Sequence, residues 1–358
     1  MTQTASAATP ATIPETMRAS VLTDIKTLSI EQVPTPPMAS DEVLVEVAAV
    51  GVCGSDTHYY RHGRIGDFVV TSPLILGHEL SGRIVAVGEE VPETRIGERV
   101  AIDPQKNCRR CRECRAGRYN LCPNMEFYAT PPIDGAFAQY CVIRTEFAHK
   151  IPDSMSDEAA ALLEPLSVAI TTMRKAGVTP GSSILIAGAG PIGILSAQAA
   201  RAFGAAEIIV TDLVLERRER ALRYGATRVL DPRETDIATA GLDVNAFVDA
   251  SGAPPAVMSG IKAVRPGGTA VLVGLGSSEM SLPVEQIQNL EIAVTGIFRY
   301  TDTWPAGIHM VSSGAVELDS LVTGRFGLEH AAEALESDVD PNSLKSVVYP
   351  NGYQQSNS

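Results

Sequence analysis

The stretch 184-ILIAGAGPIG-193 decides the fold of the second half of the chain. An apolar run of this kind predicts a buried strand, and the glycines after it match G-x-G-x-x-G at a turn from strand to helix. Gly188 permits the tight turn, Gly190 lets the backbone approach a pyrophosphate, and Gly193 lets helix and strand pack closely. The helix N-terminus then offers free N–H groups to phosphates. We therefore predict a dinucleotide site; the alternative is a glycine turn in another α/β domain.

Asp212 ends the next predicted strand, 24 residues after Gly188. A carboxylate at that point binds the ribose hydroxyls and would repel a 2′-phosphate, so NAD is favoured over NADP. Arg217 and Arg218 keep NADP open, because arginines there could receive that phosphate. A second glycine-rich turn, which begins at Gly274, is expected to face the nicotinamide end of the cofactor.

Strands and helices alternate on both sides of this motif. The predicted strands are 183–187, 207–211, 246–250, 269–273 and 291–296, and the predicted helices are 193–203, 216–224 and 256–264. This alternation is typical of a parallel sheet with helices on both faces, which is an α/β fold. A further helix is predicted over 157–176, with Ser156 as its N-cap and Gly177 just past its end.

The first 150 residues follow another pattern. Short valine-rich runs such as 42–47 and 82–88, separated by Gly and Pro, predict an antiparallel β domain. A chain of 358 residues has room for two domains of about 150 residues each. Residues 1–16 contain no Lys or Arg and no apolar core, so we expect a mobile tail, not a signal peptide. The uncharged run 176–200 is broken by turn residues, so we expect a cytoplasmic protein that does not enter membranes.

Charge and cysteine content narrow the function. The chain has 29 Lys and Arg against 42 Asp and Glu, a net charge of −13 that argues against a nucleic-acid partner. Six cysteines are too few for a disulfide scaffold, yet four of them gather at Cys108, Cys111, Cys114 and Cys122. Four thiolates at this spacing suit one tetrahedral Zn²⁺ with no open position, so the site is expected to be structural. An iron–sulfur centre is the main rival.

A more scattered set of residues could hold a second metal ion. Cys53 follows a strand, His78 and Glu79 begin another, and Glu164 lies in an apolar helical stretch. Each has an ordinary explanation as a buried thiol, a core histidine or a helix carboxylate. Spacing alone cannot join them, although a catalytic zinc needs about three protein ligands and an open position.

Several segments together resemble the zinc-dependent medium-chain dehydrogenases, most closely the sorbitol dehydrogenase branch with its xylitol and arabinitol dehydrogenases. The segments are 51-GVCGSDTHYY-60, 76-LGHELSG-82, the four-cysteine loop, 129-ATPPIDGAFAQY-140, 162-LLEPLSVA-169, 188-GAGPIG-193 and 296-GIFRYTDTWP-305. The resemblance implies a GroES-like β domain over 17–160 and 299–358, joined to a Rossmann domain with a doubly wound parallel sheet over 161–298.

The resemblance also implies roles for single residues around the scattered metal set. Cys53, His78 and Glu79 match ligands of a catalytic zinc, and Glu164 matches an acid that contacts the zinc or hydrogen-bonds its water. Asp56 would orient His78 through the other ring nitrogen. Ser55 and His58 match the remaining catalytic positions of the family, which relay protons between the zinc site and solvent.

A polyol pocket and a cofactor site follow from the same likeness. The pocket positions match Tyr59, Phe127, Thr130, Arg299 and Tyr300, with Ser55 and Glu164 beside them. The NAD contacts match Gly188, Gly190, Pro191, Ile192, Asp212 and Arg217, next to Gly193 and Gly274. The implied enzyme is an NAD-dependent polyol dehydrogenase of the sorbitol or xylitol type with two zinc ions per chain.

The likeness further implies a homotetramer, with the edge strands near 269–275 and 291–297 as the dimer seam. Three alternatives stay open: an L-arabinitol 4-dehydrogenase, another zinc alcohol or L-threonine dehydrogenase, and a non-catalytic relative that binds NAD as a sensor or structural protein. The preferred polyol is not determined by these residues.

Overall fold

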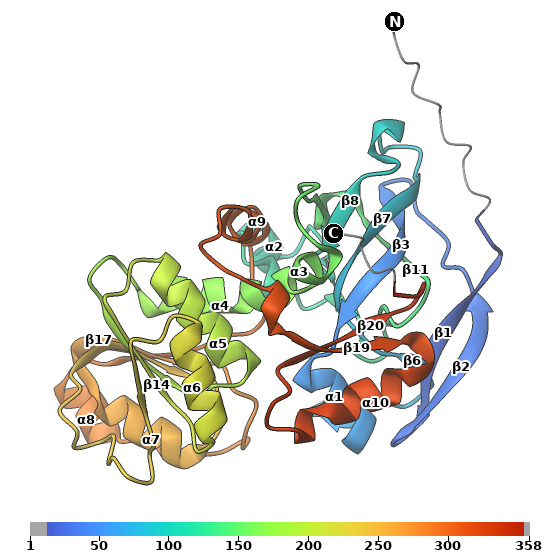
Figure 1. Ribbon diagram of the computed structural model, residues 1–358. Coiled ribbons are helices and arrows are strands. Elements are labelled where there is room, and N and C mark those ends of the chain that lie inside the picture. The colour runs from blue at the N-terminus through green and yellow to red at the C-terminus, as the bar shows by residue number, and fades with distance from the viewer. Residues whose placement is uncertain (1–12, 354–358) are drawn as a thin grey trace, which may run out of the picture.

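The two largest sheets of the molecule differ in construction, one mostly antiparallel and one all-parallel (Figure 1). The computed structural model describes residues 13–353, so most of the predicted tail lies outside it. Within the second half, six strands form an all-parallel sheet in the order β15-β14-β13-β16-β17-β18. Their bounds are Ser183–Ala187 (β13), Glu207–Thr211 (β14), Arg228–Leu230 (β15), Val244–Asp249 (β16), Val264–Leu272 (β17) and Ala293–Gly296 (β18).

The central strand β13 contains the apolar run 184–187 and is buried on both faces. Ile184 and Ile186 belong to one hydrophobic cluster, while Leu185 and Ala187 belong to another, so both faces of the strand are covered. The helices of this half are α5 (Pro191–Ala202), α6 (Leu215–Arg223), α7 (Pro254–Lys262) and α8 (Val284–Asn289). The predicted α/β fold with a parallel sheet is confirmed.

Three strand predictions in this half need correction. β16 spans Val244–Asp249 and not 246–250. β17 begins at Val264, five residues earlier than predicted, and it pairs with β16 on one side and β18 on the other. It is therefore an interior strand, and only the β18 side of the predicted seam is a sheet edge. β18 begins at Ala293, because Glu291 before it has a positive φ of 50° that interrupts extended backbone.

The first half contains a largely antiparallel sheet in the order β12-β8-β7-β3-β20-β19, with β11 also paired to β3. The strand bounds are Glu42–Gly51 (β3), Glu79–Val87 (β7), Arg99–Ile102 (β8), Tyr140–Arg144 (β11), Ala148–Lys150 (β12), Val322–Gly327 (β19) and Lys345–Tyr349 (β20). The last segment of the chain thus returns to the first domain, where Val347 on β20 pairs with Gly51 on β3. A smaller sheet contains β1 (Thr16–Asp24), β2 (Thr27–Pro34) and β6 (Leu74–Ile75). Thr16, predicted as tail, already belongs to β1.

The predicted helix over 157–176 is divided into α3 (Asp157–Ala161) and α4 (Leu163–Ala176). Ser156 caps the start, its Oγ accepting from the Ala159 N–H at 2.9 Å, and Gly177 ends the second helix at a φ of 66°. The interruption follows from Pro165, which has no N–H to donate to the carbonyl four residues earlier. Among residues 13–353, no helix combines the length and apolar character needed to cross a bilayer.

Candidate active site

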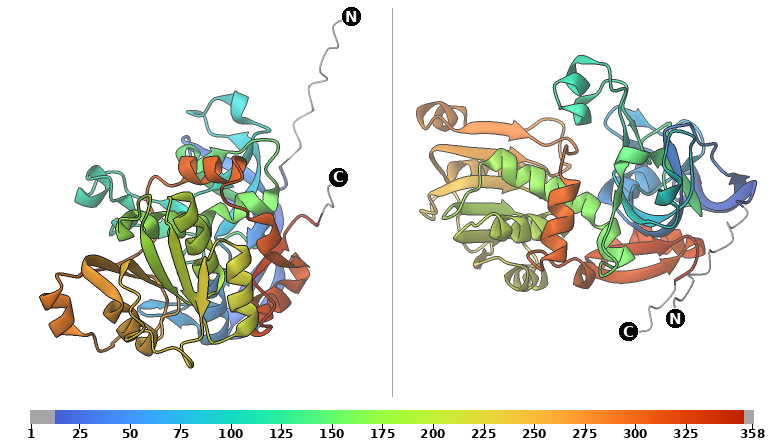
Figure 2. Two further views of the ribbon diagram at one scale, coloured as in Figure 1. Left: turned by 60° about the vertical axis from the view of Figure 1, so that its left-hand side comes forward. Right: turned by 90° about the horizontal axis from the view of Figure 1, so that it is seen from above.

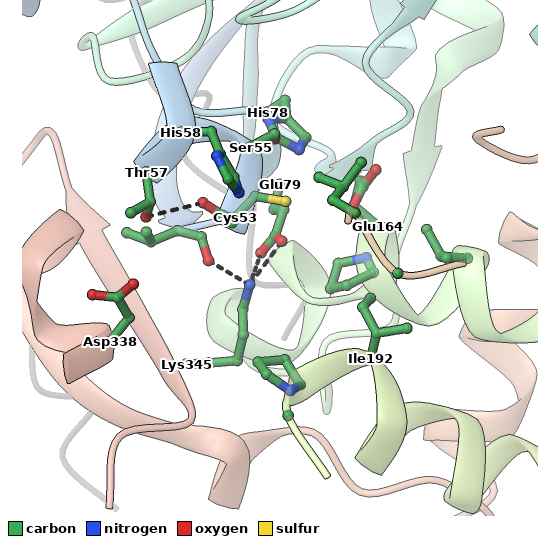
Figure 3. Close-up of a pocket in the computed structure, with 18 of the residues that line it drawn as sticks. Cys53, Ser55, Thr57, His58, His78, Glu79, Glu164, Ile192, Asp338 and Lys345 are labelled. Atoms are coloured by element: carbon green, nitrogen blue, oxygen red, sulfur yellow. Dashed lines mark hydrogen bonds and ion pairs between the residues drawn. The ribbon is translucent and has the colours of Figure 1, made fainter. Parts of the chain in front are cut away.

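Strand pairing brings together three side chains that are separated in sequence. Cys53 lies between β3 and α1 (Gly54–His62), while His78 and Glu79 stand at the start of β7. β3 and β7 are antiparallel neighbours with Gly51 opposite Glu79, and a Cβ on Gly51 would collide with the Glu79 carboxylate. One ligand atom from each of Cys53, His78 and Glu79 lies within 4.8 Å of the others. Figure 3 shows the three side chains on one wall of a pocket.

Asp56 ties the two loops of this cluster to each other. Its carboxylate accepts hydrogen bonds from the Cys53 N–H at 3.0 Å and the Gly77 N–H at 2.9 Å. Nδ1 of His78 lies 3.5 Å from the same carboxylate, which leaves Nε2 available to a metal ion. Burial opposes ionisation of Asp56, but His78 and the two N–H groups bring its pKa below the ordinary value. An ionised Asp56 therefore orients His78 from behind, as the resemblance implies.

Lys345, at the start of β20, pairs with Glu79 and was not identified from the sequence. Its Nζ lies 2.7 Å from Glu79 Oε1, contacts Oε2 as well, and donates to the Val52 carbonyl at 2.6 Å. Burial disfavours the charged ammonium, but Glu79 and Cys53 raise the pKa of Lys345. A lysine at the head of the apolar strand 345-KSVVY-349 is the one sequence signal that could have pointed to a buried partner.

Glu164 approaches the same pocket from α4, on the side opposite Lys345 (Figure 3). Its Oε1 accepts the Tyr300 hydroxyl hydrogen at 2.7 Å, and it is not part of the three-residue cluster. Burial raises the pKa of Glu164 to about 7, against the lowering effect of His78. A carboxyl group that titrates near neutrality can both take up and release a proton.

The donors of the three-residue cluster fit zinc. A thiolate, an imidazole nitrogen and a carboxylate oxygen are the ligand types of catalytic zinc sites, which keep one position open for substrate. Cys53, Glu79, Glu164 and Asp56 supply potential negative charge, whereas Lys345, His78 and Arg299 are the nearby groups able to be positive. A bound cation would balance this buried set.

One cavity of about 520 Å³ connects the cluster with the pocket residues expected from the resemblance. Ser55, His58, Tyr59, Phe127, Thr130 and Arg299 all line it. The Arg299 guanidinium lies 4.2 Å from the centre of the Phe127 ring, and burial lowers its pKa to about 10. Tyr300 is fully buried behind the wall, where it holds Glu164.

The same cavity reaches the glycine turn at the end of β13. Gly190, Pro191, Ile192, Arg217 and Gly274 line it on this side. A Cβ on Gly190 would meet nothing within 4 Å, so this glycine borders open space of the kind a pyrophosphate needs. A Cβ on Gly193 would instead collide with the Gly188 carbonyl, which accounts for the third glycine of the motif.

Asp212 lies beside the glycine turn. Its carboxylate accepts from the N–H groups of Ala189 at 2.8 Å and Val214 at 2.9 Å. Arg218 is held by the Asp212 carbonyl at 2.7 Å and by Asp231 at 3.0 Å, so it is not turned toward the cavity. Of the two arginines that kept NADP open, only Arg217 borders the cavity.

The four clustered cysteines also converge in space. One sulfur from each of Cys108, Cys111, Cys114 and Cys122 lies within 4.8 Å of the others, and all four are free thiols. Backbone N–H groups of Cys111 and Cys114 each donate to the sulfur three residues earlier at 3.4 Å. Such N–H groups lower the pKa of Cys108 to about 6, whereas burial and the neighbouring sulfurs raise the pKa of Cys114 to about 12, so a metal ion is needed to hold all four as thiolates. The donor set fits a closed tetrahedral zinc site.

Comparisons with known proteins agree with this geometry. Residues 39–153 match the family model of the alcohol dehydrogenase GroES-like domain, and residues 191–313 match that of zinc-binding dehydrogenases. The chain is 46% identical over 349 residues to a sorbitol dehydrogenase of Bacillus subtilis, covering 95% of this chain and 99% of that protein. It is 43% identical to a sorbitol dehydrogenase of Bos taurus, with 90% and 92% covered, and 39% identical to D-xylulose reductase A of Aspergillus oryzae, with 92% and 95% covered.

Solved structures show the same similarity. A zinc-binding dehydrogenase of Sinorhizobium meliloti bound to NADP superposes with a TM-score of 0.87 at 29% identity, covering 94% of this chain and 100% of that one. An alcohol dehydrogenase of E. coli CFT073 complexed with NADH superposes with a TM-score of 0.88 at 28% identity, with 94% and 100% covered. Both nicotinamide cofactors thus occur among proteins of this fold.

Proposed function

Because this chain belongs to the zinc-dependent medium-chain dehydrogenases, in the branch of the sorbitol dehydrogenases, we propose that it oxidises a secondary hydroxyl of a sugar alcohol to the ketose with NAD as hydride acceptor. One observation carries the proposal. A single cavity is lined by the three-residue metal cluster, by the glycine turn and by polar side chains such as Arg299 and Thr130. Metal, cofactor and polyol could therefore meet at one place.

Cys53, His78 and Glu79 would hold the zinc ion. Zinc bound there supplies a Lewis acid that lowers the pKa of the substrate hydroxyl, and the hydride chemistry belongs to the nicotinamide. The chain itself must orient the polyol and remove a proton. Glu164 has Oε2 free of the Tyr300 hydrogen bond and a pKa of about 7, which suits transient proton uptake. Ser55 lines the cavity and His58 is exposed, so together they offer a route to solvent.

Recognition of a sugar alcohol requires donors and acceptors along its length. Arg299 reaches the cavity over the Phe127 ring, and Tyr59 and Thr130 contribute hydroxyl groups to the same wall. A pocket whose polar groups pair with substrate hydroxyls discriminates strongly against analogues that lack them. We expect polyols to be preferred over simple alcohols for this reason.

Two features support a preference for NAD. Asp212 carries a carboxylate beside the glycine turn, and the Arg218 guanidinium is already bound by the Asp212 carbonyl and by Asp231. A carboxylate at that place disfavours a 2′-phosphate, and Arg217 is the one arginine of the pair Arg217 and Arg218 at the cavity. We also propose two zinc ions per chain, a homotetramer, a cytoplasmic location and domain boundaries at 160/161 and 298/299. Metal analysis and sedimentation would test the first two of these.

The decisive experiment is steady-state kinetics with NAD and NADP over sorbitol, xylitol, L-arabinitol, ribitol, ethanol and L-threonine. We expect the highest kcat/KM for one of the polyols with NAD. Activity on ethanol or L-threonine without activity on any polyol would overturn the substrate assignment. A higher kcat/KM with NADP would overturn the cofactor assignment.

A further inference from the structure

The four-cysteine lobe touches the segment that carries Arg299 and Tyr300. The lobe, defined as residues 105–127, contains α2 (Arg112–Arg115) and the single turn η2 (Tyr119–Leu121). Asn120 Nδ2 donates to the Phe298 carbonyl at 2.8 Å, and the Asp302 N–H donates to the Tyr119 hydroxyl oxygen at 2.9 Å. The two contacts lie on either side of Arg299. In Figure 2 the lobe, in teal, projects from the body of the molecule.

The segment 298–302 needs external support because of its backbone. Arg299 has a φ of 59° and Asp302 a φ of 49°, both in the left-handed region that non-glycine residues rarely occupy. Such residues persist when their surroundings hold them. Gln105, at the start of the lobe, adds a third support by donating from Nε2 to the Tyr300 carbonyl at 3.2 Å. From outside the lobe, Arg174 donates to the Thr301 and Asp302 carbonyls.

Three of the lobe's contacts with this segment are hydrogen bonds, made by Tyr119, Asn120 and Gln105. The Arg299 guanidinium also packs over the ring of Phe127, at the end of the lobe, 4.2 Å from its centre. A second cavity, of about 320 Å³, is lined by Tyr119, Phe147, His149, Asp302 and Trp304. The Tyr119 ring is itself placed by an edge-on contact with Phe147 at 5.9 Å.

The lobe has little of its own to keep it folded. Neither α2 nor η2 contains a buried residue, and the lobe's one strand pair, β9 (Gln105–Lys106) with β10 (Glu126–Phe127), has two residues in each strand. Tyr119 and Asn120 lie between Cys114 and Cys122, so a metal ion held by the four sulfurs would close the loop that presents them. Metal binding of this kind supplies folding free energy.

We propose that the four-cysteine metal site positions the polyol pocket: it holds Tyr119 and Asn120, which keep Arg299 and Asp302 in the left-handed backbone that turns Arg299 into the cavity. Tyr119 and Asn120 are thus positioning residues. The inference rests on the proposed function in naming Arg299 as a polyol group. The contacts that carry it do not depend on the substrate.

The first experiment compares Tyr119→Phe and Asn120→Ala with Asn124→Ala in the zinc-loaded enzyme. Asn124 is exposed on the same lobe and, among residues 13–353, makes no hydrogen bond to residues 298–302. Amide hydrogen exchange of a peptide spanning 298–303 should be severalfold faster in the two test variants and unchanged in the control. The KM for polyol should rise about tenfold while kcat changes less than threefold, as for residues that orient a binding group.

The second experiment uses Cys114→Ser, which removes one ligand of the four-cysteine site. We expect loss of one zinc per chain and faster exchange of the 298–303 peptide, as in Tyr119→Phe. Where Cys114→Ser does not fold, Tyr119→Phe, which keeps all four cysteines, decides the question alone. Unchanged exchange at 298–303 in Tyr119→Phe, or an unchanged polyol KM, would overturn the inference. If exchange responds while the parent enzyme oxidises no polyol, the proposed function fails and the structural coupling stands.

Discussion

The four-cysteine site draws its ligands from residues 108–122, whereas the Cys53 cluster draws them from residues 53, 78 and 79 on two paired strands. The first has four sulfur ligands and no other donor. The second mixes sulfur, nitrogen and oxygen, and lies in a cavity with an approach for substrate. A closed set of like ligands suits a structural ion, and an open mixed set suits chemistry.

The surroundings of the two sites differ as much as their ligands. Behind the Cys53 cluster stand buried charged groups, Asp56 and Lys345, each within reach of a ligand residue. Around the four cysteines, backbone N–H groups do the comparable work, and the arginines of the loop point to solvent or to surface acids. Buried charged side chains, of which Lys345 is distant in sequence, thus tune the Cys53 cluster, while backbone N–H groups tune the four-cysteine site.

The largest effect should come from Cys53→Ser. Removal of a ligand from a three-ligand site should lower kcat for polyol oxidation by at least about a thousandfold, since even partners behind the ligands contribute 10–100-fold. Metal analysis should show one zinc lost, with the four-cysteine zinc retained. Cys141→Ser, at a buried thiol outside both sites, should keep kcat within about threefold. Full activity of Cys53→Ser would remove the catalytic role from this cluster.

A second prediction concerns Lys345→Met. Loss of the ammonium leaves the Glu79 carboxylate buried without its partner, so the metal-free protein should lose about 3–5 kcal/mol of unfolding free energy. Zinc would replace the missing positive charge, and therefore adding zinc should stabilise the variant more than the parent.

Denaturant titrations with chelator and with zinc measure both quantities. Lys150→Met is the matched control, because Lys150 is exposed where it pairs with Glu98 and its replacement should cost less than about 1 kcal/mol of unfolding free energy. If Lys345→Met loses the same unfolding free energy with and without zinc, Lys345 stabilises the fold independently of the metal.

A third, smaller effect is expected at the other site. Cys114→Ser should lose one zinc, and the backbone amides of the lobe should exchange hydrogen faster. Its kcat should stay within about threefold of the parent, because the four sulfurs lie outside the cavity that holds the Cys53 cluster. Its polyol KM should rise as it does in Tyr119→Phe. A hundredfold loss of kcat in correctly folded Cys114→Ser would abolish the distinction between a structural and a catalytic site.

The contrast also explains what could be read from the sequence. Ligands of the four-cysteine site are close in the chain, so spacing alone predicted their convergence. The strand over 183–187 was predicted to the residue because an apolar run ended at a required glycine. The division at Leu162 was missed, since the period of apolar residues continued across it although Pro165 removed one hydrogen bond.

Contacts that form only through tertiary structure could not be predicted from spacing. Cys53 and Glu79 meet through the pairing of β3 and β7, and only the family resemblance joined them in advance. Lys345 reaches Glu79 across 266 residues, because β20 returns to the first domain beside β3. No spacing rule covers a contact that depends on how the end of the chain folds back.

The last prediction concerns stability, not catalysis, and involves Asp103. It is fully buried after β8, and Gln105, which supports the Tyr300 carbonyl, donates to its Oδ1 at 3.0 Å. Burial, with a contribution from Glu164, raises the pKa of Asp103 from 3.8 to about 8. Between these values the folded protein binds a proton that the unfolded chain has released. The unfolding free energy from this group therefore falls as pH rises, by up to about 1.4 kcal/mol per pH unit.

Asp103→Asn should remove this dependence while its amide oxygen still accepts from Gln105. The parent should lose unfolding free energy between pH 5 and pH 8 through this group, and the variant should not. The unfolding free energy of the variant minus that of the parent should therefore increase with pH. Denaturant titrations at fixed protein and zinc concentrations measure it, with Asp67→Asn as the control for an exposed aspartate. A difference that stays flat would mean that Asp103 is ionised in the folded protein. The Gln105 contact, and with it the lobe's hold on Tyr300, would then depend on a buried charge and not on a neutral carboxyl group.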